Sequence, residues 1–138
     1  ETIPNQDLFI SRQNARKVFR SLLTPSRGIR FYNNPLYLDF LRGAREYQCT
    51  AWSNPTYTVM GWREPCYLLG DRHTQDIDDL YSDELWDRFG VGNDPRCAHC
   101  LMHCGFESAS IFVALGNPKE AYRLVKAGAV QNSGVGAS

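Results

Sequence analysis

The apolar residues near the start of the chain recur with the period of an α-helix. They stand at the i, i+3, i+4, i+7 and i+8 positions of one helix face: Ala15, Val18, Phe19, Leu22 and Leu23. Ser11 precedes them and is a residue type that caps helix N-termini. Pro25 disfavours helical angles at Thr24. The pattern predicts an amphipathic helix between Ser11 and Thr24.

The Asn34–Pro35 pair predicts a second, shorter helix. Asparagine is a good N-cap, and proline suits the first helical position. The apolar residues that follow are Leu36, Tyr37, Phe40 and Leu41. Gly43 lies where this helix is expected to stop.

The pattern changes from helical to strand-like after residue 46. Residues 47–52 and 57–62 are rich in aromatic and β-branched side chains, and Ser-Asn-Pro-Thr separates them, so we expect a β-hairpin. Residues 66–69 predict another short extended piece. Thr74 and Ser82 are candidate caps for one or two short helices.

The last third of the chain returns to a helical pattern. A helix is expected to begin near residue 105 and to end at Gly116. Asn117–Pro118 with Glu120 combines an N-cap, a first-turn proline and a capping-box acid. This predicts a final helix that Gly128 closes, followed by a small polar tail.

These elements predict the α+β class: a small, cysteine-rich metal or iron–sulfur domain that contains a β-hairpin and is flanked by helices. We divide it into an N-terminal helical segment (1–46), a hairpin and cysteine-cluster domain (47–116), and a C-terminal helix with a flexible tail (117–138). The 138 residues suffice for one modest core, so the three parts are expected to form one compact domain. The chain begins at Glu1 rather than at Met, which we interpret as a piece of a longer polypeptide.

The charge composition of the chain indicates which classes of partner are compatible with it. The 15 basic and 15 acidic side chains balance, which argues against a nucleic-acid partner because phosphate binding needs an excess of Lys and Arg. The part before Tyr47 is basic and residues 71–94 are acidic, which indicates either two solvated faces or a docking surface. The sequence has no signal peptide and no apolar run long enough for a transmembrane segment, so we expect a cytoplasmic location.

The cysteines carry the candidate chemistry, and there are five of them: Cys49, Cys66, Cys97, Cys100 and Cys104. Thiolates are soft ligands that select zinc, copper(I) or iron–sulfur clusters. In a cytoplasmic protein, clustered cysteines indicate metal binding more often than disulfides. Cys97-x-x-Cys100 supplies one half of a site, and Cys49 with Cys66, at the base of the expected hairpin, supplies the other. Cys104 is a fifth candidate, one helical turn beyond Cys100.

Spacing alone leaves the metal open. Zinc and an iron–sulfur cluster are equally compatible with one clip and two separate cysteines, and His99 or His103 is a possible zinc ligand. A dithiol redox switch at Cys97 and Cys100 is a third interpretation, although no thioredoxin-like βαβ pattern surrounds the clip. No nucleophile constellation and no glycine-rich phosphate loop stands out.

The order of these residues resembles the auxiliary-cluster modules, SPASM and Twitch, of radical S-adenosylmethionine (SAM) enzymes. The matching features are Cys49, the Gly61-x4-Cys66 string and the Cys97-x2-Cys100 clip. In Twitch modules such cysteines bind one 4Fe-4S cluster, so the resemblance implies Cys49, Cys66, Cys97 and Cys100 as ligands. An alternative set replaces Cys49 with Cys104.

Longer strings are similar to the C-terminal domain of the adenosylhopane synthase family, the radical SAM proteins of hopanoid biosynthesis. They are Asn34-Pro-Leu-Tyr-Leu-Asp-Phe-Leu41, Cys49-Thr-Ala-Trp-Ser-Asn-Pro-Thr56, Gly61-Trp-Arg-Glu-Pro-Cys-Tyr-Leu-Leu69 and Cys97-Ala-His-Cys-Leu-Met-His-Cys-Gly-Phe-Glu107. The resemblance implies a parent enzyme that adds a 5′-deoxyadenosyl radical to a hopene. It implies an N-terminal barrel as partner, which binds SAM through Cys-x3-Cys-x2-Cys. This chain lacks that motif, since its Cys97-x2-Cys100-x3-Cys104 has the gaps reversed.

The resemblance leaves several roles for the cluster: electron relay, substrate binding at an open iron, or holding the fold. It also implies an apolar polycyclic substrate, for which the candidate contacts are Trp52, Tyr57, Trp62 and Tyr67. Such aromatic residues also build ordinary cores. The parent would be cytoplasmic and peripheral to the membrane. The alternative function is a zinc-stabilised interaction module without catalysis of its own.

Overall fold

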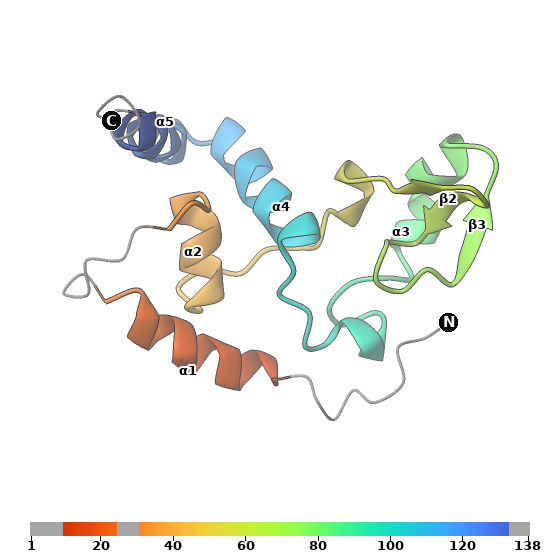
Figure 1. Cartoon of the computed structure of the whole chain (residues 1–138), viewed down its shortest axis with the longest axis horizontal. Helices are drawn as coiled ribbons and strands as arrows, with labels where there is room; N and C mark the ends of the chain where they lie inside the picture. Colours follow the sequence, from red (N-terminus) through yellow and green to blue (C-terminus); the bar gives the residue numbers. More distant parts are fainter. Residues whose placement is uncertain (1–9, 25–30, 133–138) are drawn as a thin grey trace.

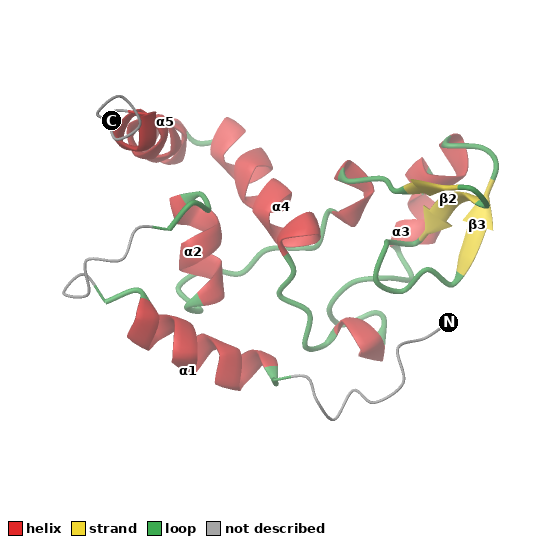
Figure 2. Ribbon diagram, in the orientation of Figure 1, coloured by secondary structure: helices red, strands yellow, loops and turns green. Residues whose placement is uncertain are grey.

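The computed structural model describes residues 10–24 and 31–132, with side chains to residue 127. It contains helices and one three-stranded sheet in the order β1-β2-β3, which confirms the α+β class (Figure 2). The elements, with η for 3-10 helices, are α1 (Arg12–Leu22), α2 (Pro35–Leu41), η3 (Ala51–Ser53), β1 (Tyr57–Thr58), β2 (Gly61–Glu64), β3 (Arg72–Thr74), η4 (Asp78–Tyr81), α3 (Asp83–Trp86), η5 (Pro95–Cys97), α4 (His103–Leu115) and α5 (Pro118–Asn132).

The two N-terminal helices begin where their caps predict. The Ser11 hydroxyl accepts the backbone N–H of Asn14 at 3.3 Å and opens α1. The Asn34 side-chain oxygen accepts the N–H groups of Leu36 and Tyr37 at 3.1 and 2.9 Å and opens α2. Each cap satisfies donors that lack a partner within the helix.

The predicted hairpin over residues 47–62 is wrong in its first strand. Antiparallel pairs join β1 to β2 and β2 to β3, so the tight turn lies between Thr58 and Gly61. Gly61 has a φ of 120°, and a Cβ there would lie 2.5 Å from a Thr74 backbone oxygen. The chain before η3 pairs with α4 instead, since the N–H and hydroxyl of Thr50 both donate to the Gly105 carbonyl, at 2.9 and 3.0 Å. Cys49 therefore does not lie at the foot of a hairpin.

Two other predicted boundaries also differ from the structure. Residues 66–69, expected to be extended, form a turn that a hydrogen bond from Gly70 N–H to the Cys66 carbonyl closes at 2.9 Å. Gly128 does not end α5, which continues to Asn132. The predicted polar tail falls mainly on residues 133–138, which lie outside the described residues.

The main core forms where α2, α4 and α5 pack together, with α1 against α2 and the sheet on the other side of the molecule (Figure 1). Phe40 and Phe106 are fully buried, and their rings stack with centroids 4.4 Å apart. Cys49 and Cys100 pack against this cluster. The candidate site and the core therefore share side chains.

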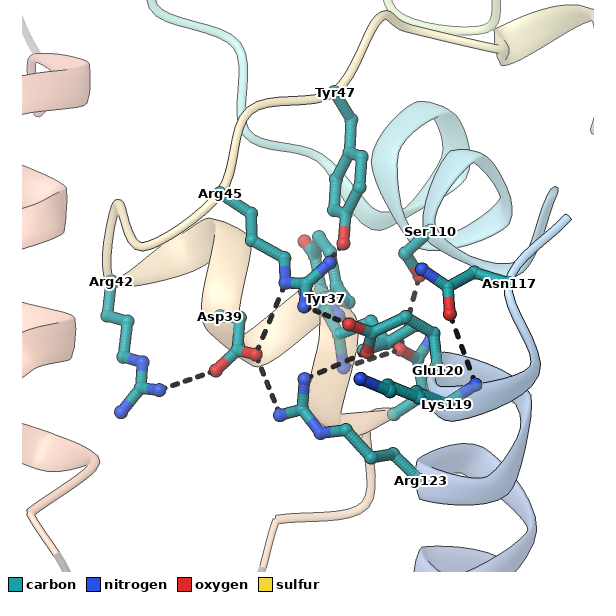
Figure 3. Close-up of polar contacts among 12 residues, drawn as sticks. Tyr37, Asp39, Arg42, Arg45, Tyr47, Ser110, Asn117, Lys119, Glu120 and Arg123 are labelled. Carbon is teal, nitrogen blue, oxygen red and sulfur yellow. Dashed lines mark hydrogen bonds and ion pairs between the residues drawn. The ribbon is translucent and has the colours of Figure 1, made fainter. Parts of the chain in front are cut away.

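Two buried carboxylates tie α2 to α5 (Figure 3). Arg123 donates to Asp39 at 2.8 Å and to Glu120 at 3.0 Å, and Arg45 pairs with both acids. Arg42 pairs with Asp39 at 2.6 Å. Glu120 was predicted as a capping-box acid, but the guanidinium groups draw its carboxylate towards α2. The network joins the C-terminal helix to the N-terminal segment.

We expect Glu120→Gln to destabilise the chain at neutral pH and to flatten the acid side of its stability curve. Hydrogen bonding, from Arg45 first and then from Arg123, holds the pKa of Glu120 below its ordinary value. A lowered folded pKa gives stabilisation that is present above the ordinary pKa and is lost as pH falls towards the folded value. Denaturant unfolding at neutral and acidic pH measures this. Glu84→Gln, at an exposed position, is the control; parallel curves for wild type and Glu120→Gln would contradict the prediction.

Candidate metal centre

The five cysteines come from three segments of the chain. Cys49 lies in the connection between α2 and η3, and Cys66 follows β2. Cys97 ends η5, Cys100 stands in the loop after it, and Cys104 lies in the first turn of α4. Because α4 begins at His103, two residues earlier than the sequence predicts, Cys104 is helical. All five are free thiols; Cys104 is buried and the other four are half-buried.

The fold gathers these thiols so closely that they affect one another electrostatically. Cys66 and Cys100 interact with each other and with all three remaining thiols. Burial, and after it the neighbouring thiols, raises the pKa of Cys49 to about 12 and that of Cys104 to about 11. Burial also raises the pKa of Cys97 and of Cys100. Without a bound cation these four thiols therefore hold their protons, whereas a coordinated metal deprotonates a thiol outright.

Hydrogen-bond donors oppose this effect at several sulfurs. Backbone N–H groups lower the pKa of Cys49, Cys97, Cys100 and Cys104; they belong to Ala51, Gly90, Met102 and Gly105, in that order. The Tyr67 side chain adds a hydrogen bond to Cys104. Hydrogen bonds to sulfur favour the thiolate and tune the potential of iron–sulfur centres. The surroundings suit sulfurs that carry negative charge.

Arg96 ties the Cys97–Cys100 clip to the segment that carries Cys66. Its guanidinium donates to both carboxylate oxygens of Asp71, at 2.7 and 2.8 Å. The same group pairs with Asp94 at 2.6 Å, and the Asp94 side chain also accepts the Arg96 N–H at 2.8 Å to cap η5. Such forked pairs fix orientation as well as position.

Two further contacts hold the clip and Cys49 against the helices. The Tyr37 hydroxyl donates to the Leu101 carbonyl at 2.7 Å, which fixes the end of the clip to α2. Gly105 leaves room for Cys49, because a Cβ at this position would lie 2.3 Å from its sulfur. Sequence reasoning missed Arg96, Tyr37 and Gly105; only the Asp-Pro-Arg string before Cys97, which is typical of a capped helix start, signals one of them.

The two histidines considered as zinc ligands, His99 and His103, are exposed. Over residues 10–24 and 31–132, no three Cys, His, Asp or Glu side chains stand as they would around a single metal ion.

The four aromatic residues proposed as substrate contacts occupy three different places. Trp52 stacks on Phe112 of α4, with ring centroids 5.4 Å apart. Tyr57 and Trp62 meet edge to face at 4.9 Å on the sheet. Tyr67 lies beside Cys104.

None of the described helices is both long enough and apolar enough to cross a bilayer.

Comparison with known proteins yields one match. No curated protein and no solved structure is detectably similar to the chain. The model of a domain of unknown function, DUF3463, matches residues 1–124. That range contains all five cysteines and every helix and strand up to the first half of α5. The chain therefore belongs to the DUF3463 family.

Proposed function

We propose that this chain is an iron–sulfur-cluster-binding domain of a radical SAM enzyme, whose parent adds a 5′-deoxyadenosyl radical to a hopene. The observation that supports a bound cluster is that five thiols from three segments interact electrostatically with one another. The parent reaction comes from the resemblance of the cysteine-bearing strings to the adenosylhopane synthase family.

The donor set fits a 4Fe-4S cluster. Such clusters are held by four Cys thiolates, and their potential responds to hydrogen bonds at sulfur. Cys66, Cys97 and Cys100 belong to both ligand sets that we consider, and Cys49 or Cys104 completes them. Backbone N–H groups lie near the sulfurs of Cys49, Cys97, Cys100 and Cys104. When bound, a cluster supplies one-electron redox chemistry or a bond between the three segments.

The residues of the chain have separate roles in this proposal. Arg96 and Asp71 hold the clip beside Cys66, and Tyr37 fixes its other end. The Trp52–Phe112 stack, with Phe112 45% exposed, is the aromatic pair that we propose to contact an apolar polycyclic substrate, because Trp52 lies on η3 directly after the Cys49 segment. SAM would bind to the N-terminal barrel of the parent, a cytoplasmic enzyme at the membrane periphery.

The first test is the metal content of the chain purified without oxygen. We expect about four irons and about four acid-labile sulfides per chain, the content of one 4Fe-4S cluster. Broad visible absorption should bleach with dithionite. One zinc without sulfide would overturn the proposal and leave a zinc-stabilised interaction module.

The enzymatic part is tested on the polypeptide that joins this domain to its barrel. Incubation with SAM, a reductant and a hopene should yield an adenosylated hopene. Absence of that product from a preparation that cleaves SAM would contradict the parent reaction and leave the cluster assignment standing.

A further inference from the structure

Arg12 of α1 is a buried cation with too few partners. Its side chain is only 12% exposed, and its ion pair, at 3.2 Å, is with Glu46, which is 66% exposed. Its Nε is buried and has no hydrogen-bond partner within the described part of the chain. A buried charge needs pairing and hydrogen bonds, and a solvated carboxylate supplies little of either. The position of Arg12 calls for a second anionic partner.

The surroundings of Arg12 show where that partner lies. Its guanidinium stands 5.0 Å from the ring centroid of Phe40 and 5.4 Å from that of Phe106. Cys100 packs against the buried cluster that contains both rings. Arg12 also interacts electrostatically with the Cys100 thiol. The cation and this cysteine therefore contact the same aromatic cluster.

We infer that Arg12 is a positioning residue of the cysteine centre, supplying positive charge and an N–H donor to its sulfurs. The inference rests on the proposed function, since thiolates bound to a cluster give Arg12 the anion that it lacks. Net charge and hydrogen bonds at sulfur set the potential of such a cluster. A nearby cation favours the reduced, more negative state, so Arg12 raises the reduction potential.

Arg16 is the matched control. It lies one turn further along α1, pairs with the same Glu46 at 2.6 Å and stands 5.9 Å from the Phe40 ring. Its Nε is also buried without a partner in the described residues. Arg12 differs from it by the contact with Phe106 and the interaction with Cys100.

The experiment is a redox titration of the loaded chain, followed by electron paramagnetic resonance. We expect a lower midpoint potential for Arg12→Gln and an unchanged potential for Arg16→Gln. Arg12→Lys, which keeps the charge, should fall between wild type and Arg12→Gln. An unchanged potential in Arg12→Gln, or equal shifts in the Gln variants at both positions, would overturn the inference.

A second measurement tests the role of Arg12 even when Arg12→Gln fails to fold. In wild type labelled with ¹⁵N-arginine, the reduced cluster should show a hyperfine coupling to nitrogen that Arg16→Lys keeps and Arg12→Lys loses. If the wild type lacks this nitrogen coupling, the inference about Arg12 is overturned, whereas the assignment of the cluster is unaffected. A wild type without iron and sulfide would remove the proposed function and the inference with it.

Discussion

Removing Cys66 or Cys100 should abolish the cluster. These two thiols interact with each other and with the remaining three cysteines. A 4Fe-4S cluster is held by four thiolates, and both ligand sets that we consider contain Cys66 and Cys100. We therefore expect Cys66→Ala and Cys100→Ala, purified without oxygen, to lose iron, sulfide and visible absorption together.

Cys49→Ala and Cys104→Ala provide the matched comparison. With five thiols for four positions, one of these two variants should keep a full complement of iron, because it removes the spare sulfur. Both Cys49 and Cys97 interact with Cys66 and Cys100. Retention of iron in Cys66→Ala or Cys100→Ala would contradict the prediction. So would its loss from both comparison variants, which would instead make all five cysteines necessary.

The helices of this fold could be predicted from local sequence because local groups decide where they begin. Ser11 and Asn34 accept backbone N–H groups three residues or fewer away, so the signal and the contact lie in the same short string. Gly128 failed as a stop signal because an isolated glycine is tolerated inside a helix.

The strand prediction failed because a distant partner decided the outcome. Residues 47–50 have strand-like side chains, but Thr50 meets Gly105, which lies 55 positions away. β-Propensity reflects packing against neighbouring side chains, and a local sequence pattern does not identify those neighbours. The same holds for the ionic network, where Glu120 has the sequence position of a capping acid and the contacts of a tertiary ion pair.

The candidate metal-binding cysteines could be predicted from the sequence. The residues that hold these cysteines in place could not. Cysteine spacing identified the thiols, since few residue types bind soft metals. The pairing of Arg96 with Asp71 and the place of Arg12 on Phe106 join segments that sequence order keeps apart. Charge alone assigned such residues to a basic or an acidic face.

The largest expected loss of folding stability follows from Phe106→Ala. The Phe106 ring is fully buried, stacks on Phe40 and lies beneath Arg12. Truncation leaves a cavity between α2 and α4, and such Phe→Ala changes cost about 3–5 kcal/mol. The free energy of unfolding of metal-free protein, from denaturant titration, measures the loss. Because whole domains are stable by only about 5–15 kcal/mol, Phe106→Leu should be measured beside it as a smaller change at the same site.

Phe112→Ala on the same helix separates this core effect from a general effect on α4. Phe112 is 45% exposed and stacks on Trp52, so its truncation removes less buried area and should cost less than Phe106→Ala. Equal losses for the two variants would show that helix α4 responds as a whole rather than through the buried pair. A greater loss for Phe106→Ala also predicts poorer cluster retention, because Cys100 packs against the buried cluster to which Phe106 belongs.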